Sequence, residues 1–242
     1  MLPILCLGVV ALLIGIILVY SLIIMFHRKE KYKDNWKEHE KDSDYLTLCD
    51  KNLAYHHPKI LKKFISPEIC DQLIALAKKR GFVKSMVANN SNDVRSRKSH
   101  QSWLPKDDNL VHPIYKRVER MTRVPIKNYE DMQIVEYTST DYFKEHYDQC
   151  FLRDDYCKGE LERFSHPRFI TVLIYLNDKH EYEGGETLFP TLNLRFKENK
   201  GDAILFYNLD ASKRYVHPKA YHSGTEIKNG LKYIGNIWVR DS

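Results

Sequence analysis

Hydrophobic and polar positions divide the chain into segments with different periodicities. The first 26 residues, MLPILCLGVVALLIGIILVYSLIIMF, are almost entirely apolar and contain no charged side chain. A charged stretch follows, and apolar residues then recur at helical spacing in two places. From residue 132 onward, short runs of β-branched and aromatic residues are separated by turn sequences. The pattern therefore predicts an apolar segment, a linker and one globular domain.

Two segments in the first half of that domain predict helices. In ISPEICDQLIALAKKRGF, Ser66 suits the N-cap, a proline follows it, and Gly81 comes after a basic last turn. A second helix is expected around residues 113–121, where apolar residues lie on one face. Both helices precede the strand-rich half of the domain.

Five runs in the second half predict strands, namely MQIVEY, FITVLIYL, LNLRF, AILFY and YIGNIWV. The sequences EGGE, KENKGD and KNG between them are typical of turns. Helices followed by many short strands indicate a mainly β, α+β domain, with an antiparallel barrel or jelly roll braced by N-terminal helices.

The apolar N-terminal block is long enough to cross a membrane, because about 20 helical residues span a hydrocarbon core of roughly 30 Å. It lacks the basic start and cleavage site of a signal peptide. We therefore predict a transmembrane signal anchor at 1–26, a charged juxtamembrane linker at 27–57 and a globular domain at 58–242.

The side of the membrane on which the domain lies stays open. The basic flank HRKEKYK favours the cytosolic face, whereas the sequon Asn89-Asn90-Ser91 would fit the lumen of the endoplasmic reticulum. We expect a single-pass membrane protein in either case.

Charge and cysteine content exclude two classes of site. The formal net charge is +6, but much of the basic clustering falls in the linker, where acidic residues are interleaved. Nucleic-acid binding is therefore not expected. The absence of a C-x-x-C pair argues against structural zinc. Cys150 and Cys157 are near enough in sequence to form a disulfide, and two free thiols fit equally well.

The stretch YFKEHYDQC contains the first candidate ligands, His146 and Asp148. In an extended strand these two side chains point to one face, in phase with Tyr142, which makes Tyr142 a candidate wall of the site. A His-x-Asp pair alone is a permissive pattern, so a third ligand must come from elsewhere.

The C-terminal segment YHSGTEIKNGLKYIGNIWVR offers His222 and Lys232. We expect its two halves to pair as an antiparallel hairpin. A two-residue Asn-Gly turn would put the two side chains on opposite faces. A three-residue loop at 228–230, or a bulge near 223–224, would put them on the same face. His217 is the rival third ligand, but it precedes a proline in a loop-like stretch.

Two histidines and one carboxylate form the facial triad of non-haem Fe(II) oxygenases, which leaves three metal positions open. A lysine on a long stem, such as Lys232, is the type of residue that holds the far carboxylate of 2-oxoglutarate. The pattern therefore indicates a metal site with an adjacent anion site.

With these residues identified, the chain resembles the catalytic domain of the 2-oxoglutarate/Fe(II)-dependent prolyl 4-hydroxylase family from about residue 58 to its end. The motifs that carry the resemblance occur in order: RKSHQSWL, EDMQIVEY, YFKEHYD, RFITVLIYLND, GGETLFP, GDAILF and HSGTEIKNGLKYIGNIW. Several features depart from the family pattern, including a slightly long connection, KHEYE, before the GGET motif. Lys98 and His100 replace more usual residues, and the segment 149–167 is lengthened, so the preferred peptide stays open.

The resemblance implies a double-stranded β-helix (jelly-roll) core and a specific set of site residues. It places the iron ligands at His146, Asp148 and His222. It assigns Lys232, Thr187, Tyr137 and Trp238 to the 2-oxoglutarate site, with Lys232 counted among the catalytic residues. It assigns Arg97, Ser99, Glu130 and Arg168 to the peptide groove.

The activity that the resemblance implies is hydroxylation of C4 of peptidyl proline in proline-rich or collagen-like sequences. It would be coupled to oxidative decarboxylation of 2-oxoglutarate to succinate, with Fe²⁺, O₂ and L-ascorbate. Two alternatives are an oxygenase for another substrate, such as a lysyl residue or a nucleobase, and a catalytically silent jelly-roll module. Nucleobase enzymes of this fold generally use arginine for the distal carboxylate, so Lys232 argues against them.

Overall fold

The computed structural model describes residues 54–85, 96–149, 166–213 and 215–241. The predicted anchor at 1–26, nearly all of the linker, the sequon, Cys150 and Cys157 lie outside these residues. Among the helices that the structure describes, none combines the length and the apolar character needed to cross a membrane. The anchor, the position of the domain boundary and the location of the protein stay predictions.

Both predicted helices are present. Helix α2 (Pro67–Arg80) begins at Ser66, whose side chain accepts a hydrogen bond from the Ile69 amide, and closes at Gly81 with a positive φ of 93°. Helix α3 (His112–Thr122) follows, and three short 3₁₀ turns complete the helical part: η1 (Ile126–Asn128), η2 (Pro190–Leu192) and η3 (Pro218–Ala220).

The larger sheet contains seven antiparallel strands in the order β1-β11-β7-β14-β5-β4-β2. Their bounds are β1 (Lys59–Leu61), β2 (Val83–Lys84), β4 (His100–Leu104), β5 (Met132–Tyr137), β7 (Arg168–Tyr175), β11 (Ala203–Tyr207) and β14 (Lys232–Arg240). Four of the five predicted strands belong to this sheet.

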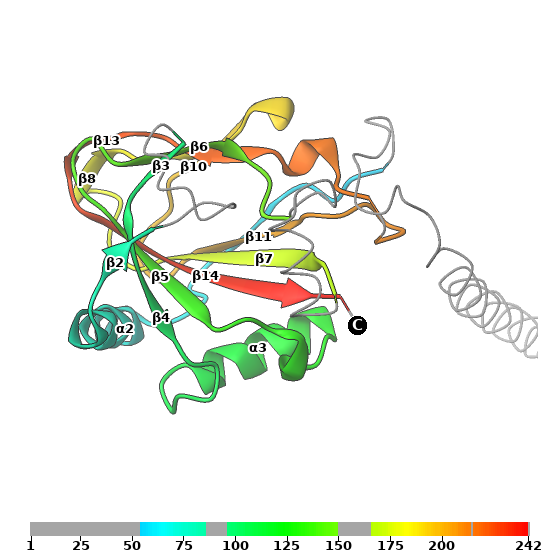
Figure 1. Cartoon of the computed structure of the whole chain (residues 1–242), viewed down its shortest axis with the longest axis horizontal. Helices are drawn as coiled ribbons and strands as arrows, with labels where there is room; N and C mark the ends of the chain where they lie inside the picture. The colour runs from blue at the N-terminus through cyan, green and yellow to red at the C-terminus, as the bar shows by residue number, and fades with distance from the viewer. Residues whose placement is uncertain (1–53, 86–95, 150–165, 214, 242) are drawn as a thin grey trace, which may run out of the picture. The chain divides into compact units, whose positions relative to one another are not determined.

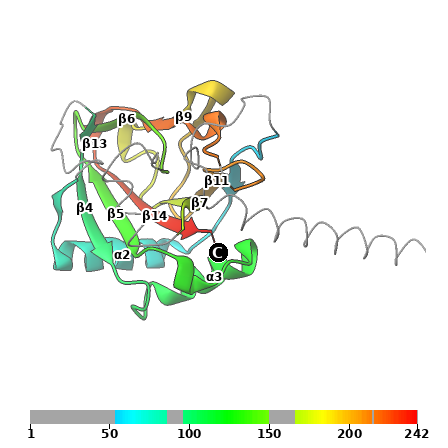
Figure 2. The same ribbon diagram turned by 45° about the vertical axis from the view of Figure 1, so that its right-hand side comes forward.

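The smaller sheet contains five strands in the order β10-β9-β12-β6-β3. Their bounds are β3 (Arg97–Lys98), β6 (Tyr142–His146), β9 (Thr187–Phe189), β10 (Leu194–Phe196) and β12 (His222–Gly224). Two further strands, β8 (Tyr182–Gly184) and β13 (Ile227–Gly230), pair with each other. The two main sheets face each other, and α2 and α3 cover the outer face of the larger one (Figures 1 and 2). The jelly-roll expectation is confirmed.

Alternation along β7 shows how the larger sheet separates two cores. Ile170, Val172 and Ile174 point outward into a cluster with the helices. Leu173 and Tyr175 point inward into a second cluster, which also contains aromatic residues of the smaller sheet. Because strand side chains alternate, Thr171 must also point inward, between the sheets.

The predicted C-terminal hairpin is wrong among the residues described. Strand β13 pairs with β8, whereas β14 pairs with β5 and β7 in the larger sheet. Glycine permits this pairing: Gly184 has a positive φ of 75°, and a side chain there would collide with the carbonyl oxygen of Glu226. His222 and Lys232 therefore reach the same space from two facing sheets.

Candidate metal centre and adjoining pocket

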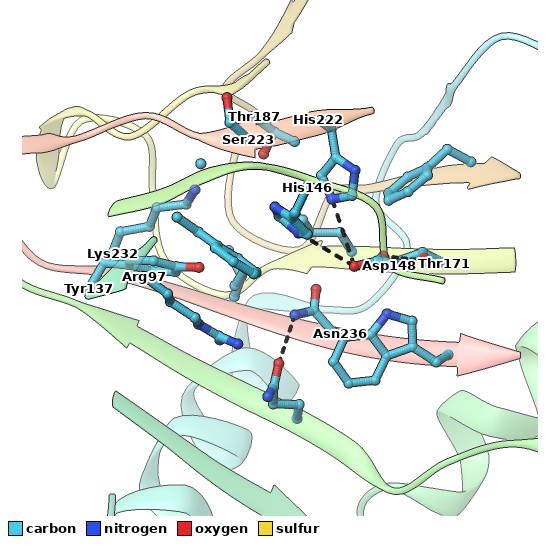
Figure 3. Close-up of a pocket in the computed structure, with 17 residues that line it drawn as sticks. Arg97, Tyr137, His146, Asp148, Thr171, Thr187, His222, Ser223, Lys232 and Asn236 are labelled. Atoms are coloured by element: carbon cyan, nitrogen blue, oxygen red, sulfur yellow. Dashed lines mark hydrogen bonds and ion pairs between the residues drawn. The ribbon is translucent and has the colours of Figure 1, made fainter. Parts of the chain in front are cut away.

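One pocket between the two sheets collects most of the predicted site residues (Figure 3). The larger sheet contributes side chains from β5, β7, β11 and β14, and the smaller sheet contributes side chains from β3, β6, β9 and β12. The predicted residues that line it are Arg97, Tyr137, His146, Asp148, Thr187, His222, Lys232 and Trp238. Ser99, Glu130 and Arg168 are not among the lining residues.

His146, Asp148 and His222 form a group whose candidate ligand atoms all lie within 4.8 Å of one another. The Asp148 Oδ1 atom is 3.6 Å from His146 Nε2 and 3.8 Å from His222 Nε2. The two histidines are directly paired across β6 and β12. In the part of the chain that the structure describes, this is the single group of three or more such residues.

Hydrogen bonds to backbone carbonyl oxygens orient the rings of both histidines. The Nδ1 atom of His146 lies 2.7 Å from the carbonyl oxygen of Lys144, and that of His222 lies 2.9 Å from the carbonyl oxygen of Ala220. A carbonyl oxygen only accepts, so each Nδ1 carries the proton and each Nε2 presents its lone pair to the centre.

Aromatic side chains hold the two imidazoles in place. Phe143 stacks on His146 with ring centroids 3.5 Å apart, and Phe189 stacks on His222 at 5.3 Å. The expectation that Tyr142 lines the site is wrong, because Phe143 does so instead. The pairing of β6 with β12 shifts register between His146 and Phe143, which breaks the simple alternation.

Asp148 follows the end of β6, and its two carboxylate oxygens have different partners. Its Oδ2 atom accepts a 2.6 Å hydrogen bond from Thr171 Oγ1, while Oδ1 faces the histidines. Burial alone would raise the pKa of Asp148, but the neighbouring histidines lower it well below its usual range. Burial also lowers the pKa of His222 to about 4, so this ring is neutral at physiological pH.

These donors fit a divalent iron ion. Two neutral imidazole nitrogens and one carboxylate oxygen are the ligand set of the facial triad, and the remaining positions would face the pocket. Oriented Nδ1–H groups are the usual supports of metal-bound histidine. The backbone hydrogen bonds at Nδ1 already place both histidines in the tautomer that offers Nε2 to an ion.

Lys232 forms the other end of the pocket. Its side chain is buried, and Nζ donates a 2.7 Å hydrogen bond to the Gly185 carbonyl oxygen. Burial lowers the pKa of Lys232 to about 7. Thr187 also lines this part of the pocket, and its hydroxyl accepts a 3.1 Å hydrogen bond from Tyr175. Tyr137 is directly opposite Lys232 in the sheet, so three predicted residues meet here.

Arg97 and Ser99 lie together at the edge of the pocket. Arg97 Nε donates a 2.9 Å hydrogen bond to Ser99 Oγ, and its guanidinium lies 4.6 Å from the centroid of Phe143. Arg97 is buried and lines the pocket, whereas Ser99 supports it from behind. Their contact with a peptide stays a prediction.

Glu130 and Arg168 belong to a buried ion-pair network next to the pocket. Arg168 binds both carboxylate oxygens of Glu130 at 2.6 and 2.8 Å, and Arg240 binds Glu130 at 2.8 Å. Arg168 also donates to the Asp148 carbonyl oxygen and lies 3.9 Å from the ring centroid of Trp238. The network therefore supports Asp148 and Trp238 from outside the pocket. Its contact with a peptide stays a prediction.

The rival ligand His217 does not join the metal group. It is buried at the start of η3, where its Nδ1 accepts a hydrogen bond from the Lys219 amide. Sequence reasoning missed Phe143 and Thr171, which also line the pocket. Thr171 could have been found from the sequence, because it is a polar residue within the largely apolar strand segment FITVLIYL.

The sequence profile of the 2OG-Fe(II) oxygenase superfamily matches residues 132–240. A putative prolyl 4-hydroxylase of Acanthamoeba polyphaga mimivirus is 34% identical over 200 residues, which cover 83% of this chain and 79% of that protein. Prolyl 4-hydroxylase 1 of Arabidopsis thaliana is 29% identical over 205 residues, which cover 75% of this chain and 68% of that protein.

A solved structure shows the same likeness in three dimensions. It is the viral collagen prolyl hydroxylase of Paramecium bursaria Chlorella virus-1 in its complex with 2OG. The match has a TM-score of 0.61 at 28% sequence identity and covers 77% of this chain and 97% of that chain.

Proposed function

This chain belongs to the prolyl 4-hydroxylase family of 2-oxoglutarate- and Fe(II)-dependent oxygenases, and we propose that it hydroxylates C4 of prolyl residues in proline-rich peptides. The observation that carries this proposal is the convergence of the triad His146, Asp148 and His222 with the buried Lys232 on one pocket.

We assign the iron ligands to His146 Nε2, Asp148 Oδ1 and His222 Nε2. The chemistry that bound iron supplies is activation of O₂, both for decarboxylation of 2-oxoglutarate to succinate and for oxidation of the substrate. Backbone carbonyl oxygens accept from Nδ1 of each imidazole, so that Nε2 faces inward, and aromatic rings stack on both imidazoles.

We assign the distal carboxylate of 2-oxoglutarate to Lys232 and Thr187, with Tyr137 as a further hydrogen-bond partner. Nζ of Lys232 already has one carbonyl partner, and an ammonium group has two more protons to donate. A carboxylate next to this buried amine favours its charged form, so Lys232 both orients and selects the anion.

We assign peptide binding to the pocket entrance, with Arg97 and Trp238 at its wall and Ser99, Glu130 and Arg168 as their supports. Proline-rich chains adopt the polyproline II helix readily, so a groove can bind them at modest entropic cost. Arg97 is a fixed donor for peptide carbonyl groups, which suits prolyl segments because proline lacks a backbone N–H.

Three further parts of the proposal concern the whole protein. We propose that ascorbate restores iron that is oxidised in uncoupled turnovers. We also propose that residues 1–26 anchor the enzyme in a membrane by a single span, and that 58–242 form the oxygenase domain. The length and apolar character of the first 26 residues support the anchor. The side of the membrane is either the endoplasmic reticulum lumen or the cytosolic face.

The peptide assay that tests this function uses the full chain with Fe(II), 2-oxoglutarate and ascorbate. We expect succinate formation to rise on addition of proline-rich or collagen-like peptides, and mass spectrometry to find the added oxygen on prolyl C4. The matched control is the same peptide with alanine in place of proline, which should give only the basal rate. Oxygen found on lysine, with proline left unchanged, would assign the chain to the alternative lysyl activity.

The affinity for 2-oxoglutarate should fall as the pH rises above about 7. Lys232 has a pKa of about 7, because it is buried. Below that pH its amine is already charged. Above it the amine must take up a proton to bind the carboxylate, which costs up to about tenfold in affinity per pH unit.

Isothermal titration calorimetry of the Mn(II)-loaded protein measures this uptake. In buffers of different ionisation enthalpy, binding should take up close to one proton at pH 8 and almost none at pH 6. Lys232→Arg, which stays charged, is the control and should show no uptake at either pH. Wild-type binding without proton uptake at pH 8 would contradict the role of Lys232.

A further inference from the structure

We infer that Thr171 and Asn208 are positioning residues for the metal-binding carboxylate of Asp148. Together they form a hydrogen-bond relay that holds one carboxylate oxygen and leaves the other free for the ion. The inference rests on the proposed role of Asp148 as an iron ligand.

The relay consists of two short hydrogen bonds. Thr171 Oγ1 donates a 2.6 Å hydrogen bond to Asp148 Oδ2, and Asn208 Nδ2 donates a 2.9 Å hydrogen bond to Thr171 Oγ1. Both Thr171 and Asn208 are 1% exposed. Thr171 lies on β7 and Asn208 follows β11, so the larger sheet supports a ligand that extends from the smaller sheet.

The direction of the relay follows from the number of protons available. A threonine hydroxyl has one proton, and an amide NH₂ group only donates. Since Asn208 donates to Thr171, the threonine proton must go to Asp148. Asn208 itself is fixed by its backbone, whose N–H binds the Phe169 carbonyl oxygen and whose own carbonyl oxygen accepts from the His217 amide.

The side-chain oxygen of Asn208 supports this assignment. Within the part of the chain that the structure describes, this buried atom has no hydrogen-bond partner. The asparagine therefore leaves its own acceptor unpaired while it donates to Thr171.

Asp148 needs such support because β6 ends at His146. Strand pairing fixes the two histidines, whereas the aspartate lies beyond the ladder, and rotation about its terminal torsion is broad. A carboxylate that binds through one oxygen occupies one metal position. If it turned to bind through both oxygens, it would occupy a second position that the co-substrates need.

The decisive variant is Thr171→Val, which keeps the shape of the side chain and removes the hydroxyl. We expect the affinity for Mn(II), measured by electron paramagnetic resonance on the full chain, to fall about 10–100-fold, as it does when other outer partners of metal ligands are removed. Thr171→Ser should restore the wild-type value. Wild-type Mn(II) affinity in the valine variant would overturn the inference.

A double-mutant cycle separates a relay from two independent effects. Asn208→Ala should weaken Mn(II) binding by less than Thr171→Val, because the hydroxyl remains but is free to turn away. In the double variant the loss should equal that of Thr171→Val alone, since Asn208 acts only through Thr171. Losses that add would overturn the relay.

The control for general damage is Ser102→Ala. Ser102 is a buried hydroxyl on the same sheet, but it faces the helices and donates to the Ala77 carbonyl oxygen. Its loss should leave Mn(II) binding unchanged. Thermal unfolding of the metal-free proteins shows which variants fold. If Thr171→Val does not fold, the test rests on Asn208→Ala. An Mn(II) affinity equal to that of the wild type in this variant would then overturn the inference.

The binding experiment needs neither peptide nor turnover. If the relay variants bind Mn(II) weakly while the wild-type enzyme leaves every prolyl peptide unchanged, the inference stands and the proposed substrate is wrong. If peptides are hydroxylated and the relay variants bind Mn(II) normally, the inference alone fails.

Discussion

Replacing His146 with alanine should reduce peptide-coupled succinate formation by about 1,000-fold or more, equivalent to roughly 4 kcal/mol of transition-state stabilisation. The variant removes one of three ligands, and the two that remain cannot enclose an octahedral ion from one face. We expect Fe(II) binding and the charge-transfer band of the 2-oxoglutarate complex to disappear together. Both are measured anaerobically by absorbance during an Fe(II) titration.

The matched control for this variant is His180→Ala. The His180 side chain is 82% exposed, lies 4.0 Å from the Asp178 carboxylate and is not among the residues that line the pocket. It should retain the wild-type rate and the band. A His146→Ala variant with intact peptide-coupled turnover would show that the metal site has been assigned to the wrong residues.

Replacing Lys232 should strongly weaken the binding of 2-oxoglutarate. Lys232→Met keeps much of the length of the side chain but removes the charged hydrogen-bond donor. A hydrogen bond to a charged group contributes about 1.5–3 kcal/mol, so the KM for 2-oxoglutarate should rise roughly 10–150-fold. The metal ligands are untouched, and Mn(II) affinity without 2-oxoglutarate should stay at the wild-type value.

The same variant should make the metal-free protein more stable, and the sign of its pH dependence is fixed. The folded-state pKa of Lys232 is about 7, below its ordinary value, so the unfolded chain binds more protons between about pH 7 and 10.5. The buried amine therefore destabilises most below pH 7. The gain from Lys232→Met should be largest there and vanish towards pH 10.5, as measured by urea unfolding. A loss of stability at pH 6 would indicate that Lys232 is not buried as described.

The sequence was sufficient to predict both helices, five of the strand segments and the metal group with the lysine at the other end of the pocket. Periodicity identifies a strand and its two faces, and the N-cap Ser66 and terminal Gly81 identify the ends of α2. The order of the motifs supported the choice of His222 over His217. These features depend on local chemistry, which the sequence displays directly.

Strand pairing and short-range distances could not be predicted in the same way. Asn229-Gly230 suits a tight hairpin, yet β13 pairs with β8, because the backbone at Gly184 allows a close approach from a distant part of the chain. The bulge in β6 moved Phe143 into the position expected for Tyr142. Alternation shows that Thr171 points inward, but not that it lies 2.6 Å from Asp148.

Because the pocket is formed by two opposing sheets, a ligand bound in it should stabilise the folded protein. Both histidines belong to the smaller sheet, and Lys232 belongs to the larger one. An anion that contacts the metal and the lysine joins the two layers. At 100 times its Kd such a ligand adds about 2.7 kcal/mol to the stability of the folded state. We therefore expect the thermal unfolding temperature of the metal-loaded protein to rise with the concentration of 2-oxoglutarate.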